Sequence, residues 1–193
     1  MLTILFKIKI FKMCVIGIDP SINSTGVCVA TGKKDIYYII TPKMTKKMKE
    51  FDNKYIKYLP YEKKQYTDME YHEKEVIKTD NFKNILSQLE YIIKKHKPDT
   101  CVMEGVSYGS VKGSALIDLS GLNYLIRMLL NKYNIQFTIV PPTSLKKFVC
   151  GNGQADKELM IHTWKKMDKN IQNITDIKID DLADAYFMAH YTA

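Results

Sequence analysis

Two short apolar runs in this chain each end in an acidic residue, and both have the length and composition of buried β-strands. Val15-Ile16-Gly17-Ile18 leads into Asp19, and Cys101-Val102-Met103 leads into Glu104. A carboxylate at the end of a buried strand costs folding free energy unless its charge is compensated. In a fold that contains both strands, we therefore expect these two acids to have a function that offsets the cost of burying them.

A second pair of acids lies near the C-terminus. Asp181 and Asp184 are three residues apart on a predicted helix, so they project from one face of it. Carboxylates that separate elements bring together repel one another unless a cation lies between them, and Mg²⁺ prefers such oxygen ligands. The four acids therefore predict a Mg²⁺ site. Three alternatives stay open. Asp19, beside Pro20, could be an Asx-turn residue, and Glu104, before Gly105, could mark the start of a loop. The helical pair could be first-turn acids that complement the helix dipole.

The composition is that of a basic globular protein. Lys and Arg outnumber Asp and Glu by 29 to 21 over 193 residues, which gives a formal charge of +8, and 46% of the residues are hydrophobic. This balance fits a polyanion-binding protein, although a merely soluble basic surface would look the same. The length predicts a single domain over 1–193.

Cysteine usage and hydropathy address the compartment. The four cysteines contain no Cys-x-x-Cys pair, which argues against a disulfide framework and for a reducing compartment. No apolar stretch is long enough to span a membrane, and the apolar start of the chain lacks a small-residue cleavage site. We therefore expect a cytoplasmic protein that is neither secreted nor membrane-bound.

Apolar periodicity predicts an α/β fold. The predicted strands are 14–19, 26–30, 36–40, 100–104 and 136–140, and the predicted helices are 80–95, 113–132, a short one near 143, 155–167 and 180–190. Asp80 is the expected N-cap of the first helix. Residues 43–79 are predicted to be a charged insertion or mobile segment that can carry some helix, and their lysines contact either DNA or solvent. Three strands that form a meander, followed by alternating helices and strands, predict a ribonuclease-H-like mixed five-stranded sheet with helices on both faces.

The acidic motifs carry a family resemblance. Gly17-Ile18-Asp19-Pro20-Ser21, followed by Thr25-Gly26, resembles the Gly-Ile-Asp-Pro-Gly…Thr-Gly opening of the RuvC family of Holliday junction resolvases. Glu104 ends a strand as the family's second acid does, and Asp181-x-x-Asp184-Ala185 is similar to the family's closing Asp-x-x-Asp-Ala helix. The resemblance implies that Asp19, Glu104, Asp181 and Asp184 are the catalytic, metal-binding residues.

A further stretch, Ser144 to Lys157, is similar to the family's Val-Lys…Gly-x-Gly-x-Ala-x-Lys segment. The resemblance implies that Lys146 and Lys157 contact the junction; surface lysines beside a glycine-terminated helix are the alternative. An aromatic residue three positions after the Glu stacks on a base in the bacterial enzyme, but this chain has Ser107 there and Tyr108 beside it. Tyr108 either takes over stacking, worth about 1–3 kcal/mol per base, or packs. The expected DNA-contacting residues are Lys146, Lys147, Lys157, Tyr108 and Lys112.

The expected activity is junction resolution. Phosphodiester hydrolysis by two metals needs cations about 3.5–4 Å apart, one activating water and one stabilising the leaving oxygen. We expect two Mg²⁺ ions, replaceable by Mn²⁺, with Asp19 bridging them. The resemblance implies a homodimer that cuts opposing strands of a four-way junction, and small residues on helix 113–132 (Ser114, Ala115, Ser120, Gly121) would allow close approach of a second copy.

Three other functions remain open at this stage. A nuclease of the same fold could act on other branched DNA, such as flaps or forks. An actin-like ATPase or sugar kinase also opens with an acidic phosphate loop on a first hairpin, although it usually needs a longer chain. A non-catalytic DNA-binding relative is disfavoured because all four acids are present.

Overall fold

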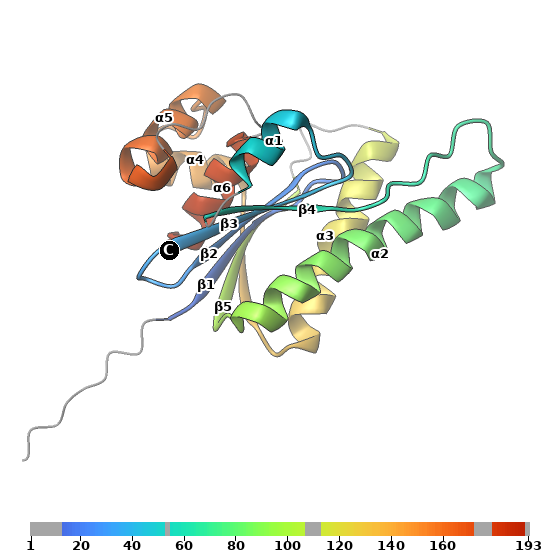
Figure 1. The fold of residues 1–193 in the computed structure, drawn as a ribbon, viewed down its shortest axis with the longest axis horizontal. Helices are drawn as coiled ribbons and strands as arrows, with labels where there is room; N and C mark the ends of the chain where they lie inside the picture. The colour runs from blue at the N-terminus through green and yellow to red at the C-terminus, as the bar shows by residue number, and fades with distance from the viewer. Residues whose placement is uncertain (1–12, 53–54, 107–112, 172–178, 192–193) are drawn as a thin grey trace, which may run out of the picture.

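The structure, a computed structural model, describes residues 13–52, 55–106, 113–171 and 179–191. Its centre is a six-stranded sheet in the order β4-β3-β2-β1-β5-β6 (Figure 1). The strands are β1 (Val15–Asp19), β2 (Thr25–Ala30), β3 (Asp35–Thr41), β4 (Ile56–Pro60), β5 (Thr100–Glu104) and β6 (Gln136–Val140). The first three form an antiparallel meander, and the other neighbouring pairs are parallel. The α/β, ribonuclease-H-like prediction is confirmed in its architecture.

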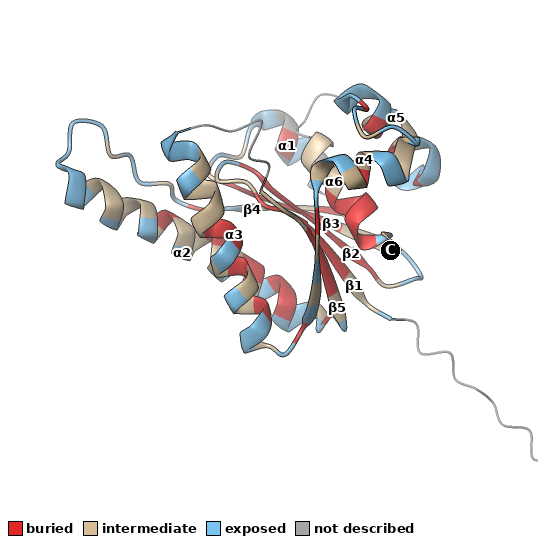
Figure 2. Cartoon of the chain, turned by 180° about the vertical axis from the view of Figure 1, so that it is seen from behind, coloured by how far each residue is buried: buried red, intermediate tan, exposed pale blue. Residues whose placement is uncertain are grey.

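Helices cover both faces of the sheet, and Figure 2 shows the buried residues concentrated on the strands and on the helix faces turned toward them. One layer holds the two longer helices and the other holds the shorter ones, with the C-terminal helix packed directly on β1 and β2. The first layer is α2 (Tyr71–His96) and α3 (Ser114–Lys132); the second is α1 (Lys46–Phe51), α4 (Pro142–Cys150), α5 (Lys157–Met167), a 3-10 turn (Lys169–Ile171) and α6 (Ile179–Ala189).

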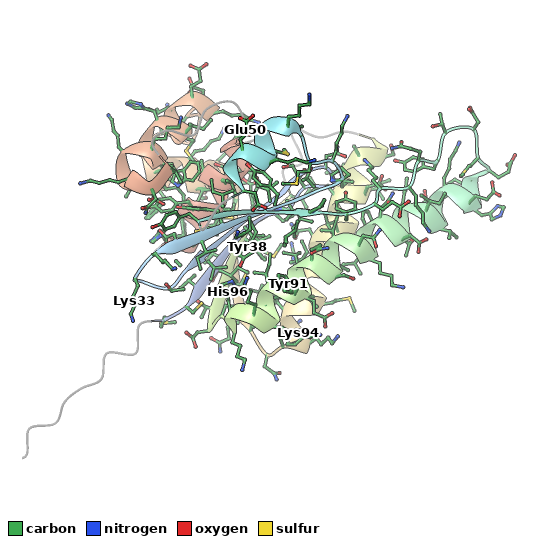
Figure 3. All side chains as sticks on the ribbon, viewed as in Figure 1. Lys33, Tyr38, Glu50, Tyr91, Lys94 and His96 are labelled. Atoms are coloured by element: carbon green, nitrogen blue, oxygen red, sulfur yellow. The ribbon has the colours of Figure 1, made fainter. Side chains whose placement is uncertain are left out.

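The alternation of side chains along the strands divides the core in two. Ile16 and Ile18 of β1 pack with α2 and α3, so the residues between and after them, Gly17 and Asp19, face α6. A hydrogen bond of 2.7 Å between the Tyr38 hydroxyl and His96 Nε2 ties β3 to the end of α2 (Figure 3). The fold therefore turns the acid at the end of β1 toward the layer that contains α6.

The predicted five-stranded sheet is wrong by one strand, because residues 43–79 are not merely a charged insertion. They contain α1, β4 and the first turns of α2. β4 pairs in parallel with β3, and it buries Ile56 and Tyr58 while the lysine between them remains partly exposed. This alternation spans only a few residues within a Lys- and Tyr-rich stretch, which hid the strand from the sequence pattern.

The start of α2 also differs from the prediction. The helix begins at Tyr71, after Glu70, whose backbone N–H donates to the Glu73 carboxylate at 3.0 Å. Asp80 is therefore not an N-cap; it lies inside the helix and accepts a hydrogen bond of 2.7 Å from Lys64 Nζ. The first turns of α2 carry few buried side chains, so apolar periodicity alone could not locate them.

Two further features bear on the compartment. The four cysteines are free thiols, and Cys28 and Cys101 are buried in the core. Within the described ranges, none of the helices combines the length and apolar character of a membrane span.

Candidate active site

Two glycines allow α6 to rest directly on the sheet. A Cβ atom on Gly17 would lie 2.1 Å from the backbone oxygen of Ala185, and one on Gly26 would lie 2.2 Å from the backbone oxygen of Asp181. Neither distance is possible for a real side chain, so β1 and β2 can only accept the helix here because both residues lack a Cβ. This close contact brings the N-terminal turns of α6 alongside the end of β1.

The four predicted acids line one pocket as a result. Asp19 reaches it from the end of β1, Glu104 from the end of β5, and Asp181 and Asp184 from α6. The pocket has a volume of about 380 Å³, and its wall also contains Lys146, Lys157 and Asp180. The structure thus brings together acids that are separated by up to most of the chain length.

Burial and mutual repulsion raise the pKa values of three of these carboxyl groups, those of Asp19, Glu104 and Asp184. Asp19 is only 8% exposed, and burial, followed by the charges of Glu104, Asp181 and Asp184, raises its pKa well above the usual range. Burial and the charge of Asp184 raise the pKa of Glu104 to about 7, and burial and Asp180 raise that of Asp184 to about 6. The hydrogen bond between Asp19 and Glu104 raises the pKa of Asp19 and lowers that of Glu104.

The donor set fits a hard divalent cation in its chemistry. All four groups are carboxylates, and the raised pKa values of Asp19, Glu104 and Asp184 mean that cation binding would compete with protons at these three groups. In the part of the chain that the structure describes, no three His, Cys, Asp or Glu side chains already converge as a ready-made metal site. Cation binding would therefore require side chains in the pocket to turn toward a common point.

Two lysines from the predicted segment reach the same pocket. Lys146 of α4 lowers the pKa values of Glu104 and Asp184 by its positive charge. Lys157, the first residue of α5, forms a salt bridge of 2.6 Å with Asp180, which raises the pKa of the lysine. Asp180, the sequence neighbour of Asp181, is thus the partner of Lys157.

The turn between α4 and α5 explains how both lysines arrive there. Gly151 ends α4 in a left-handed conformation with φ of 72°, and Asp156 caps α5 by accepting from the backbone N–H of Leu159 at 2.8 Å. Lys147, also predicted to contact DNA, is exposed and does not line the pocket. The other two predicted contacts, Tyr108 and Lys112, lie outside the described residues.

The sequence interpretation missed one buried polar residue at this site. Asn123 of α3 lines the pocket, and its side-chain amide donates a hydrogen bond of 2.9 Å to the backbone oxygen of Glu104. Its own oxygen accepts two hydrogen bonds from Arg127. The sequence does contain a signal for this residue. Asn123 is a polar residue on the apolar face of a predicted helix, one turn from the only arginine in the chain.

Comparisons with known proteins identify related sequences over most of the chain. The family model described as "Crossover junction endodeoxyribonuclease RuvC" matches residues 63–190. The RuvC protein of Brachyspira hyodysenteriae is 27% identical over 177 residues, which cover 92% of this chain and 91% of the relative. That of Chloroherpeton thalassium is 36% identical over 85 residues, 44% of this chain and 45% of the relative.

Solved structures show the same architecture at low sequence identity. Thermus thermophilus RuvC superposes with a TM-score of 0.58 at 14% identity, covering 92% of this chain and 91% of that one. The same protein in complex with a Holliday junction substrate gives a TM-score of 0.59 at 15% identity, with 92% and 90% covered. The yeast mitochondrial Holliday junction resolvase gives 0.51 at 16% identity, with 92% and 76% covered. Because the family model matches residues 63–190, which are more than half of this chain, the chain belongs to the RuvC family of crossover junction endodeoxyribonucleases.

Proposed function

We propose that this protein resolves four-way DNA junctions by paired strand cuts, with Asp19, Glu104, Asp181 and Asp184 as the ligands of two Mg²⁺ ions. The observation that carries the proposal is the pocket in which these acids, delivered by β1, β5 and α6, lie together with two lysines. A basic chain with a formal charge of +8 that still concentrates buried carboxylates at one point suits a polyanionic substrate handled with cations. Mn²⁺ would take the place of Mg²⁺ with the same ligands.

The residues divide the work by position. When bound, the divalent cations activate water and stabilise the leaving oxygen of the phosphodiester. Asp19 is the most buried of the acids and is held on a central strand, so it is suited to be shared between the two cations. Lys146 stands among the acids, where it can neutralise charge on the scissile phosphate. Lys157 is exposed and held by Asp180, so it can turn to a phosphate of the bound strand.

A substrate panel tests the proposal. We expect the purified protein with Mg²⁺ to cut a synthetic four-way junction faster than a 5′ flap or a Y-shaped fork of matched sequence, and to leave duplex DNA intact. The measurement is the single-turnover rate on end-labelled substrates, at one stated salt concentration because phosphate contacts weaken with salt. Equal or faster cutting of flaps would assign the protein to other branched DNA instead. Cation-dependent ATP turnover without any cutting would favour the ATPase alternative.

Paired cutting requires two active sites, and we propose that α3 supplies the contact between two copies of the chain. Its outward face exposes three large apolar side chains at spacings of seven and four residues: Ile117 (73% exposed), Tyr124 (62%) and Met128 (66%). Gly121, one of the small residues that suggested dimerisation in the sequence, faces Phe82 of α2 instead. The large apolar residues therefore support a symmetric helix-to-helix contact.

Charge on this face should separate the copies. We expect Ile117→Lys combined with Met128→Lys to raise the dimer dissociation constant by at least about tenfold, because buried apolar anchors dominate such contacts. Sedimentation velocity measures the association, and nicking of one strand should replace paired cutting of the junction. Val76→Lys provides the matched control, because Val76 is 60% exposed on α2. A wild-type protein that sediments as a monomer at assay concentrations would contradict the assignment.

A further inference from the structure

We propose that Asn123 and Arg127 of α3 form a positioning relay that holds the backbone of Glu104, and thereby its carboxylate, at the acid pocket. The inference rests on the proposed function, because it takes Glu104 to be a metal ligand. It goes beyond that function by assigning a role to two residues outside the acidic motifs. Three observations carry it: a donor missing at the end of β5, the replacement of that donor by Asn123, and the fork of hydrogen bonds from Arg127.

The missing donor follows from the register of the sheet. Alternate residues of a parallel strand bond to opposite neighbours. The backbone N–H of Gly105 donates to the Val140 oxygen of β6 at 2.9 Å, so the backbone oxygen of Glu104 faces β1. The β1–β5 pairing runs to Ile18 opposite Met103, and continuing it brings the position after Asp19 beside this oxygen. That position is Pro20, which has no N–H to donate.

Asn123 supplies the donor that the proline lacks. Asn123 lies on α3, which packs against the sheet, and its side-chain Nδ2 is 2.9 Å from the backbone oxygen of Glu104. The residue is buried and lines the pocket, so its amide has little access to bulk water. A buried backbone oxygen without a partner costs free energy, and a strand end relieves that cost by shifting. The hydrogen bond therefore fixes the end of β5 at the residue whose side chain enters the pocket.

Arg127 fixes the orientation of the Asn123 amide. Its Nε and Nη2 lie 2.9 and 2.6 Å from Asn123 Oδ1. A guanidinium can only donate, so it selects the amide orientation in which the oxygen faces Arg127 and the nitrogen faces Glu104. The guanidinium also stacks on Tyr124, with Cζ 4.5 Å from the ring centroid. All the other basic residues among the 29 Lys and Arg are lysines, and a lysine could not provide this planar fork.

A merely structural asparagine would have a different effect, and the chain contains one for comparison. Asn81 of α2 is as buried as Asn123, at 2% exposed for each, and it also bonds to backbone through both ends of its amide. Its partner is Lys64, which does not line the acid pocket. Replacing Asn81 should therefore reduce stability without altering the pocket, whereas replacing Asn123 should alter both.

The test measures cation binding in the absence of DNA. Isothermal titration with Mn²⁺ should show a dissociation constant raised by roughly 10–100-fold in Asn123→Leu, the range found when a residue that orients a metal ligand is removed. Arg127→Lys, which keeps the charge and loses the fork, should shift the constant in the same direction, and it serves if Asn123→Leu does not fold. Asn81→Leu should lower Tm and leave Mn²⁺ binding unchanged.

The outcomes separate the relay from the site itself. If Glu104→Gln binds Mn²⁺ as the wild type does, the assignment of Glu104 as a ligand fails. If Glu104→Gln loses binding while Asn123→Leu and Arg127→Lys keep wild-type affinity, the relay alone is overturned. An Asn81→Leu shift as large as that of Asn123→Leu would also overturn it, because general destabilisation would then explain both.

Discussion

Replacing Asp19 with asparagine should abolish junction cleavage and, at the same time, stabilise the metal-free protein at alkaline pH. Cleavage should fall by roughly two to three orders of magnitude, the loss seen when one charge-stabilising group is removed from an active site. Stability should rise because the asparagine amide can donate to Glu104 at any pH and brings no charge that must be buried. These opposite effects distinguish a functional carboxylate from a structural one.

The pH dependence follows from the direction of the pKa shifts. The pKa of Asp19 is raised well above its usual range, mainly by burial, and those of Glu104 and Asp184 are raised to about 7 and about 6. Their contribution to stability is fully present below the unfolded-state values near pH 4 and is lost as the pH rises through the folded-state values. The metal-free wild type should therefore lose stability from about pH 4 to beyond pH 7, and Asp19→Asn should lose less.

Thermal unfolding in EDTA at pH 5 and pH 8 measures this difference. For a chain of this size, each kcal/mol gained corresponds to about 2–4 °C in Tm. Added Mg²⁺ should reverse the order of the two proteins at pH 8, because a ligand stabilises the protein that binds it better. A lower Tm for Asp19→Asn than for the wild type in EDTA at pH 8 would contradict the inference that the buried charge of Asp19 destabilises the metal-free pocket.

Asp168 provides the matched control. It is 7% exposed, close to the 8% of Asp19, but it accepts hydrogen bonds from the Tyr37 hydroxyl at 2.6 Å and from the backbone and side chain of Asn170. Its carboxylate is satisfied by donors, so Asp168→Asn should lower Tm at both pH values. It should also retain cleavage at a permissive temperature, because Asp168 does not line the acid pocket.

The positions of Asp19 and Glu104 could be predicted because each ends a run of apolar residues, where burial makes a charge conspicuous. Asp181 and Asp184 could be predicted as a pair by helical spacing. That all four line one pocket required the topology, since β1 and β5 are neighbours only through a crossover that includes all of α2. The acids were therefore found by local pattern, and their convergence was inferred from the fold class.

The features that were missed depend on contacts between distant segments. β4 is short and lies within a Lys- and Tyr-rich stretch, so only its pairing with β3 identifies it. The hydrogen bond from Asn123 to Glu104 depends on where α3 lies over β5, and Pro20 comes beside the Glu104 oxygen only when the β1–β5 register is continued past Ile18 and Met103. Likewise, Lys146 and Lys147 are adjacent in sequence, but the helical turn of α4 directs only Lys146 into the pocket. Local sequence does not distinguish these cases.

Gly26→Ala should disrupt both the fold and the site, because Gly26 lies at the contact on which α6 rests against β2. The new Cβ would lie 2.2 Å from the Asp181 oxygen and 2.6 Å from the Asp181 carbonyl carbon, and these backbone atoms cannot rotate away. The helix would have to lift from β2 by roughly an ångström, carrying Asp181 and Asp184 with it. Overpacking of this kind costs about 1–3 kcal/mol or more, and a displacement of about 1 Å at an active site can cost about a hundredfold in rate.

Gly121→Ala provides the matched control, because the Cβ at Gly121 would meet only the Phe82 ring edge at 3.6 Å, an ordinary contact. An alanine in the middle of α3 should stabilise the helix by about 0.5–1 kcal/mol. Gly26→Ala should therefore lower both Tm and the rate of junction cleavage, whereas Gly121→Ala should raise Tm and leave cleavage unchanged. A Gly26→Ala protein with wild-type Tm and cleavage rate would show that α6 does not rest on β2 at this residue. Another contact would then have to hold Asp181 and Asp184 near Asp19, since the contact at Gly26 sets how near Asp181 can come to the end of β1.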